Sequence, residues 1–181
     1  KTDKMKSYSD LKNTIEDKFV LATSERDMRF YLLGLLALES GARVSDLLKL
    51  SWHSVDFELL TLSYMNTKGK KRQSANLTRT LIGYILRYKE TLESNKVYND
   101  KIFFNSYKNT VLSRVTANRR TQKEFGINFH QLRKESAKNV ATYKGVVMAS
   151  KHLGHSRVST TDIYLGVSND EFLEQMKTVP M

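Results

Sequence analysis

Apolar residues recur at helical spacing along most of the chain. Leu11, Ile15 and Phe19 mark one face of a first helix, and Ser9 is the residue expected to cap it. Further helices are predicted at about 81–92, 107–120, 131–143, 146–153, 159–165 and 169–178. The only proline is Pro180, so no internal proline interrupts these segments.

The second helix is predicted to lie in the centre of the protein. Ser24 and Asp27 form a capping box, and the run that follows is apolar nearly all round as far as Leu38. Gly41 is expected to end this helix, and a short segment from Arg43 to Leu50 follows it.

Residues 55–77 change from helical to strand-like character. Residues 59–65 predict a strand, residues 66–70 a turn, and the residues up to Leu77 a second strand, with a third strand possible beside this hairpin. Ile102-Phe103-Phe104 predicts a short buried strand or loop anchor. The expected fold class is therefore mainly α with a small antiparallel β-sheet (α+β).

The charge of the chain points to an anionic partner. Thirty Lys and Arg residues against nineteen Asp and Glu give a formal net charge of +11. Nucleic acid is the first candidate, and a membrane surface is less well supported because the charge is not gathered on one amphipathic helix. The chain contains no cysteine and no apolar run near the roughly 20 residues that span a bilayer. We expect a cytoplasmic protein without metal or cofactor.

The segment 154–164 offers a candidate nucleophile. One straight helix would place His155 and Tyr164 on opposite faces, but Gly154 can end a helix and Ser159 with Asp162 can cap a new one. The chain can then bend so that both side chains face one pocket. A tyrosine beside a histidine in a basic protein suggests a nucleophile aimed at phosphate, although a core tyrosine is the commoner case.

Three other positions could hold phosphate. His130 and Arg133 share one face at the start of a helix, where an anion binds well, although such a pair also arises by chance. Arg43 follows the buried helix and can either pair with Asp46 or present its guanidinium to phosphate with Asp46 as its holder. Lys68 sits at the tip of the expected hairpin, where a lysine is often only solvated.

Taken together in this order, these residues resemble the catalytic domain of the tyrosine recombinases, the integrase family of phages and conjugative elements. The resemblance runs from about residue 8 to 178. The matching motifs are G-A-R-V-S-D-L-L-K-L-S-W, T-K-G-K-K-R, H-Q-L-R and L-G-H-S-R-V-S-T-T-D-I-Y.

The resemblance implies a mechanism in which Tyr164 attacks a DNA phosphodiester and forms a 3′-phosphotyrosine. Arg43 and Arg133 would clamp the non-bridging oxygens. His130 would bind the phosphate and help to take the tyrosine proton. His155 would donate to a phosphate oxygen, and Lys68 would protonate the leaving 5′-oxygen. Neither ATP nor metal is implied.

Two positions depart from the family pattern, and one assignment has competitors. Lys134 stands where many members have histidine, and Asp46 where glutamate is frequent. Lys70 and Lys71 lie in the same turn as Lys68. The resemblance further implies residues 1–166 as the catalytic domain and 167–181 as a C-terminal tail.

The assembly implied by the resemblance is a homo-tetramer on two DNA duplexes, with the isolated domain a monomer. An N-terminal core-binding domain, usual in the family, is absent from the sequence. The tail can dock on a neighbouring subunit or fold back on its own domain, through the apolar residues Phe172, Leu173, Met176 and Val179.

Two other functions remain open. Residues 146–165 read as helix, turn, helix, which is typical of a non-catalytic DNA-binding module. A type IB topoisomerase would share the tyrosine chemistry but relax supercoils instead of exchanging strands.

Overall fold

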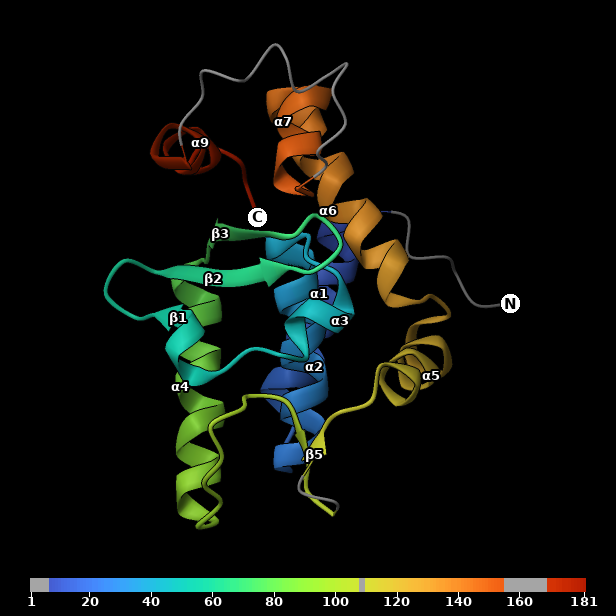
Figure 1. Ribbon diagram of the computed structural model, residues 1–181. Coiled ribbons are helices and arrows are strands. Elements are labelled where there is room, and N and C mark those ends of the chain that lie inside the picture. The colour runs from blue at the N-terminus through green and yellow to red at the C-terminus, as the bar shows by residue number, and fades with distance from the viewer. Residues whose placement is uncertain (1–6, 108–109, 155–168) are drawn as a thin grey trace.

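The computed structural model describes residues 7–107, 110–154 and 169–181, and Figure 1 shows their arrangement. The helices in this part of the chain are α1 (Tyr8–Leu21), α2 (Glu25–Ser40), α3 (Val44–Leu47), α4 (Arg79–Ser94), α5 (Arg114–Phe125), α6 (Phe129–Lys144), α7 (Val146–His152) and α9 (Asn169–Met176), with a 3-10 turn η1 (Trp52–Ser54). The strands are β1 (Val55–Asp56), β2 (Thr61–Asn66), β3 (Lys71–Asn76), β4 (Phe104–Asn105) and β5 (Thr110–Val111). The expected class, mainly α with small antiparallel sheets, is confirmed.

Helix α2 forms the centre of the molecule and packs against α1, α4 and α6. Its residues from Met28 to Ser40 are all buried, as the apolar run predicts. Ser24 caps it by accepting a hydrogen bond from the Asp27 amide, and Gly41 ends it in the left-handed conformation. Both ends of this helix are confirmed.

The first helix differs from its prediction at its cap. Ser7, not Ser9, is the N-cap, and its side chain accepts from the backbone amide of Asp10. A serine cap must lie outside the helix, in extended backbone, and Ser9 already lies inside the first turn. The predicted face is confirmed, because Leu11, Ile15 and Phe19 are buried in the core.

The main sheet has the antiparallel order β1-β2-β3, so the optional third strand of the sequence analysis is present. In the β2–β3 hairpin, Thr61 pairs with Asn76 and Asn66 pairs with Lys71. Residues 67–70 form the turn, and Lys70 has a φ of 53°. The sheet lies beside α2 and α3, with the turn end of the hairpin toward α6 and α7 (Figure 1).

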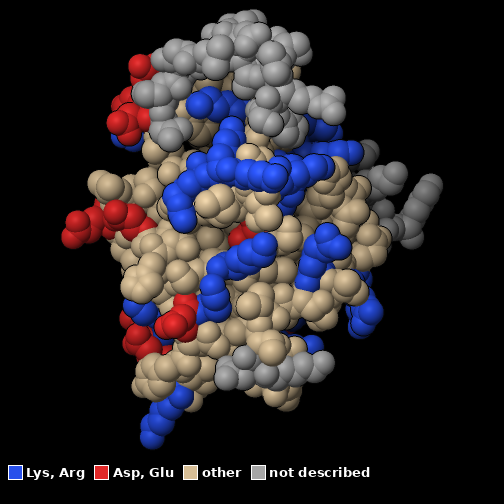
Figure 2. Space-filling view, in the orientation of Figure 1, with Lys and Arg blue, Asp and Glu red and all other residues tan. Residues whose placement is uncertain are grey.

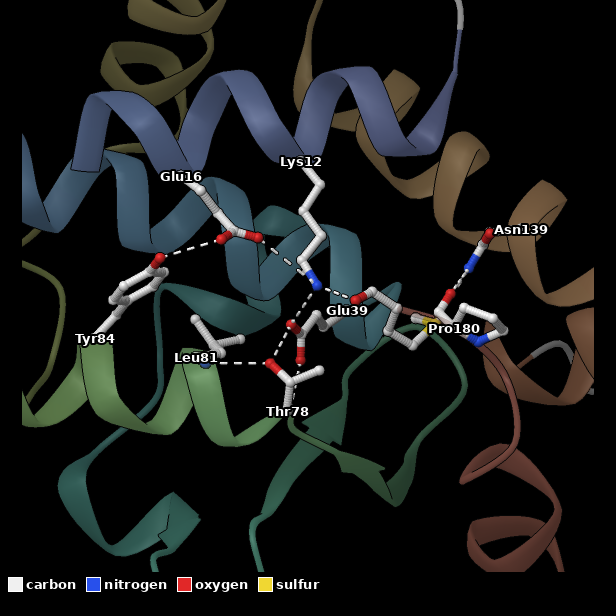
Figure 3. A network of polar contacts seen from close by, with 9 residues as sticks. Lys12, Glu16, Glu39, Thr78, Leu81, Tyr84, Asn139 and Pro180 are labelled. Atoms are coloured by element: carbon white, nitrogen blue, oxygen red, sulfur yellow. Dashed lines mark hydrogen bonds and ion pairs between the residues drawn. The ribbon is translucent and has the colours of Figure 1, made fainter. Parts of the chain in front are cut away.

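A buried polar network ties α1, α2 and the start of α4 together (Figure 3). The Glu39 carboxylate accepts from the Thr78 amide at 2.8 Å and from the Thr78 hydroxyl at 2.7 Å, and Lys12 Nζ lies 3.4 Å from it. Lys12 also pairs with Glu16, which accepts from the Tyr84 hydroxyl. The carboxylate therefore lies on the residue that caps α4, with a cation beside it.

The described part of the tail lies on its own domain in this single chain. Phe172, Met176 and Val179 are buried against Val140, Met148 and Ala149. Three backbone carbonyls of the tail are also held, since Lys12 donates to Met181, Asn139 donates to Pro180 at 2.7 Å, and Asn76 donates to Leu173 at 2.7 Å. The tail thus bridges β3, α6 and α1.

Two other expectations have different outcomes. The helix predicted at about 107–120 begins only at Arg114, because Thr110 and Val111 form β5 beside Phe104. The helix predicted at 159–165 lies outside the described residues. Within the described part of the chain, no helix is long and apolar enough to span a membrane.

Candidate active site

Three of the predicted site residues meet at one pocket. Arg43, His130 and Arg133 all line a cavity of about 420 Å³ between α3, α5 and α6. Arg43 reaches it from the turn after α2, and the other two from the first turns of α6. The pairing of distant motifs that the sequence suggested is therefore present in the fold.

Gly41 sets the direction in which the chain leaves α2 toward Arg43. Its φ of 68° is in the left-handed region, where a side chain is strained. A Cβ atom there would also lie 2.6 Å from His152 Nε2. The turn therefore needs glycine on both counts, and it rests directly on α7.

Arg133 is fixed by two backbone carbonyls. Its Nε donates to Gly41 O at 2.7 Å, and its Nη2 donates to Leu153 O at 2.6 Å. The side chain is buried, and burial first and the charge of Arg43 second lower its pKa to about 10. Arg133 stays positive at neutral pH. Its charge is buried near that of Arg43, so an incoming anion would offset the repulsion between the two guanidiniums.

Neither Arg43 nor Arg133 has a carboxylate ion pair among the described residues. Arg43 is half-buried and donates from Nη1 to Asn66 Oδ1 at 2.8 Å. Two positive guanidiniums that repel each other are costly to keep in one pocket, and the nearby charge of Asp46 offsets this repulsion only in part, since the pKa of Arg133 is still lowered. Binding of an anion is the physical situation that makes this arrangement favourable.

His130 is exposed at the second position of α6. Asn128 caps this helix in a capping box with Gln131, so its N-terminus is well formed and opens on the same pocket. A helix N-terminus carries partial positive charge and favours a phosphate nearby. Arg114, which starts α5, adds a third arginine that the sequence motifs did not single out.

Asp46 does not hold Arg43, which corrects the sequence-based interpretation. Its Oδ1 accepts from the Thr67 hydroxyl at 2.7 Å and the Thr67 amide at 3.3 Å. Its Oδ2 is buried and has no hydrogen-bond partner among the described residues. Asp46 therefore anchors Thr67, the residue before Lys68 in the hairpin turn, rather than Arg43.

Lys68 is exposed in the hairpin turn. The turn itself is fixed, because the Gly69 amide donates to Asn66 Oδ1 at 3.0 Å and Asp46 holds Thr67. Of the competing lysines, Lys71 is on β3 and lies near Lys151. The pKa of Lys151 is lowered mainly by burial and in second place by the charge of Lys71. Lys68 remains a predicted site residue, exposed on a turn that is anchored at the residues on either side of it.

His155 and Tyr164 lie outside the described residues. Leu153 O accepts from Arg133, and Gly154 O accepts from Asn66 Nδ2 at 3.4 Å. The described chain is therefore hydrogen-bonded to Arg133 and Asn66 as far as Gly154, the last described residue before His155.

Sequence reasoning missed the buried residues that support this pocket. His152 Nε2 lies 2.8 Å from the Ser136 hydroxyl, and burial first, then Arg133, lowers the His152 pKa to about 4. Tyr64 is also buried here, and burial is the main reason that its pKa is raised to about 12. With His152 and Tyr64 neutral, the local charges are those of the two arginines and of the buried Asp46, which interacts with Arg133.

The surface around the site is strongly basic. Figure 2 shows Lys and Arg side chains in a band across the middle of one face, with acidic side chains mostly at its left edge. Figure 1, in the same orientation, places the three-stranded sheet and α3 under this region. Such a surface suits a polyanion larger than a single phosphate.

A comparison with protein families identifies the family of the chain. The model of the phage integrase family matches residues 8–171. The chain belongs to the phage integrase family. The expected family resemblance is thereby confirmed over nearly the whole chain.

Curated members of the family give the same picture. Tyrosine recombinase XerA of Pyrococcus horikoshii is 31% identical over 92% of this chain and 60% of its own length. Tyrosine recombinase XerC of Caldanaerobacter subterraneus is 28% identical over 94% of this chain and 48% of its own length. The chain thus spans about half to three-fifths of these recombinases.

Solved structures confirm the fold of this family member. The crystal structure of XerA recombinase superposes with a TM-score of 0.68 at 22% identity, covering 97% of this chain and 64% of XerA. XerH site-specific recombinase, bound to its difH substrate in a pre-cleavage complex, superposes with a TM-score of 0.69 at 20% identity, covering 98% of this chain and 55% of XerH. The fold is that of a tyrosine recombinase catalytic domain.

Proposed function

We propose that this chain is the catalytic domain of a site-specific DNA recombinase that cleaves and rejoins strands through a 3′-phosphotyrosine at Tyr164. The observation that carries the proposal is the convergence of Arg43, His130 and Arg133 on one pocket with no carboxylate ion pair to either arginine among the described residues. Family membership and the likeness to XerH bound to difH support it.

In the proposed reaction, the Tyr164 oxygen attacks the phosphorus of a DNA phosphodiester. A new phosphorus–oxygen bond to tyrosine forms while the bond to the 5′-oxygen breaks. His130 accepts the tyrosine proton and Lys68 gives a proton to the leaving 5′-oxygen, so charge is balanced. Arg43, Arg133 and His155 bind the non-bridging oxygens and stabilise the pentacovalent transition state. The reverse attack by another strand's 5′-hydroxyl rejoins the DNA.

The rest of the assembly is also proposed. Residues 1–166 form the catalytic domain, and a separate core-binding domain completes the grip on the duplex. The acting species is a tetramer on two duplexes, and the isolated chain is a monomer in the cytoplasm. The tail of residues 167–181, whose described part rests on its own domain in the single chain, docks on a neighbour in the tetramer. The XerH complex supports DNA as the partner.

A covalent trapping assay tests the proposal. A library of nicked duplexes with randomised sequence around the nick is incubated with the chain, and protein–DNA adducts that survive denaturation are recovered. We expect an adduct that is lost in Tyr164→Phe and kept in Tyr143→Phe, a matched control at an exposed tyrosine of α6. The adduct links protein to a 3′-phosphate and releases a 5′-hydroxyl.

The trapping assay, together with relaxation of a supercoiled plasmid and joining of strands from two duplexes, distinguishes the alternatives. A helix-turn-helix module binds the duplex but forms no adduct, even in the wild-type chain with Tyr164 and Tyr143 both intact. A topoisomerase forms the adduct and relaxes a supercoiled plasmid without joining strands of two duplexes. An adduct that persists in Tyr164→Phe contradicts the proposed nucleophile.

A further inference from the structure

Asn66, the last residue of β2, is hydrogen-bonded on both sides of its amide. It is 2% exposed. Its Oδ1 accepts from Arg43 Nη1 at 2.8 Å and from the Gly69 amide at 3.0 Å. Its Nδ2 donates to Gln73 Oε1 at 2.6 Å and to Gly154 O at 3.4 Å. One side chain therefore contacts three separate segments of the candidate site.

The chemistry of these partners requires an amide at this position. Arg43 and the Gly69 amide can only donate, and the Gly154 carbonyl can only accept. The oxygen and nitrogen of Asn66 are thus assigned by their neighbours, and a residue with only acceptors or no polar atoms would lose one side or both. The Gly154 backbone also lies so close that a Cβ there would be 2.5 Å from Asn66 Nδ2.

We infer that Asn66 is a positioning residue of the recombination reaction. Its amide sets the Arg43 guanidinium, the turn that bears Lys68 and the chain that enters His155 in one relative arrangement. This inference rests on the proposed function, since it assigns a role within the same site. It names a residue outside the motif residues to which catalytic roles are assigned.

The position of these contacts argues for a role in catalysis beyond folding. Asn66 bonds to Arg43, which lines the pocket, and to two other polar segments, whereas the helices are held together by the apolar core around α2. A misplacement of about 1 Å in a reacting group can cost about 10²-fold in rate. Three groups that act on one phosphate must share a frame, and the hydrogen bonds of Asn66 supply it.

The test compares Asn66→Leu with Thr121→Val. Leucine keeps the size of asparagine and removes all four hydrogen bonds. Thr121 is buried on α5, and its hydroxyl donates to Ala117 O at 2.8 Å, so Thr121→Val also removes a buried hydrogen bond but away from the pocket. Three quantities are measured for each chain: the melting temperature, the affinity for the nicked duplex selected by trapping, and the single-turnover rate of adduct formation.

For Asn66→Leu we expect a rate about 10²-fold lower with duplex affinity within about threefold of the wild type. Thr121→Val is expected to keep its rate. A double-mutant cycle with Arg43→Met sharpens the result. If Asn66 acts largely through Arg43, Asn66→Leu lowers the rate at least about tenfold less in the Arg43→Met background than in the wild type.

A readout without DNA tests the geometry alone. The Gly69 amide is hydrogen-bonded to Asn66, so its hydrogen exchange is expected to accelerate in Asn66→Leu and to stay unchanged in Thr121→Val. Unchanged Gly69 exchange overturns the inference, and so does an Asn66→Leu rate within threefold of Thr121→Val. Rate, affinity and melting temperature falling together also overturn it, in favour of a general folding role. A wild-type chain with no adduct on Tyr164 overturns the proposed function and the inference together.

Discussion

The molecule contains two clusters of buried polar side chains, and they differ in how their charge is neutralised. In the cluster around Glu39, a carboxylate, a lysine and a capping threonine satisfy one another between α1, α2 and α4 (Figure 3). In the cluster around Arg133, two arginines are held by neutral groups, namely Asn66 and the carbonyls of Gly41 and Leu153.

The difference separates a structural cluster from a functional one. Paired charges inside a protein need no further partner, and removal of one member leaves the other exposed to the low dielectric of the interior. Hydrogen bonds that a guanidinium donates to neutral carbonyls fix it without cancelling its charge, so the charge remains available to a ligand. The first cluster should therefore govern stability, and the second should govern reaction rate.

The largest expected effect on reaction rate comes from Arg43→Met. Methionine removes the charge and one hydrogen bond to Asn66, and it also removes repulsion with Arg133. We expect adduct formation to slow by about 10²–10³-fold, the loss typical of one transition-state donor, while the free energy of unfolding changes by less than about 1 kcal/mol. Single-turnover trapping and urea titration measure the two quantities. A variant that melts much earlier and cleaves normally would erase the contrast between the clusters.

Lys12→Met should give the opposite result. Burial raises the pKa of Glu39, and Lys12 is the first of the groups that lower it. Without Lys12, the carboxylate is left unpaired, which costs about 3–5 kcal/mol in comparable pairs. Urea titration near neutral pH is expected to show that loss, and the adduct rate measured well below the melting temperature should stay within about threefold of the wild type.

The pH dependence of that deficit follows from the direction of the Glu39 pKa. When the folded-state pKa of a carboxyl group lies above its unfolded-state pKa, the protein loses stability as the pH rises through the interval between the two pKa values. Lys12→Met raises the folded-state pKa further. The deficit relative to the wild type should therefore shrink as the solution is acidified and Glu39 becomes protonated. A deficit that is equal at all pH values would assign the loss to packing instead.

The sequence predicts best what depends on local pattern. The apolar run of α2 and its ends at Ser24 and Gly41 were predicted correctly, because capping and helical periodicity act within a few residues. The serine cap of α1 was misplaced by two residues, since Ser7 and Ser9 are equal in chemistry and only the backbone distinguishes them. Helix α5 was predicted too early because a two-residue strand has no periodicity to read.

The site follows the same rule. Motif residues such as Arg43 and Arg133 could be named from the sequence, and the pocket unites them. The partners that hold them could not, because they depend on contacts between distant segments. Asn66 stands in a predicted turn, where asparagine is common for local reasons, and its role becomes visible only when Gly154 lies against it. Asp46 was assigned to the arginine by spacing, and the fold gives it to Thr67.

The smallest expected effect, counted per pH unit, concerns His152, which is buried beside Arg133. Burial and Arg133 lower its pKa to about 4, against about 6.5 in an unfolded chain. The unfolded state therefore takes up a proton first, and stability is lost as pH falls from about 6.5 toward 4, with a slope of up to about 1.4 kcal/mol per pH unit. Above about pH 8 the histidine is neutral in both states and adds almost no slope.

The variant His152→Gln tests this titration by removing the titrating ring while keeping a side chain that can bond to Ser136. We expect the variant to be less stable than the wild type at pH 7.5, because glutamine fills the space of the ring poorly. Its stability should then fall less steeply than that of the wild type between pH 6.5 and 4.5. Parallel urea titrations across this range measure both slopes. If the two slopes coincide, another group accounts for the acid sensitivity, and burial with Arg133 does not keep His152 neutral.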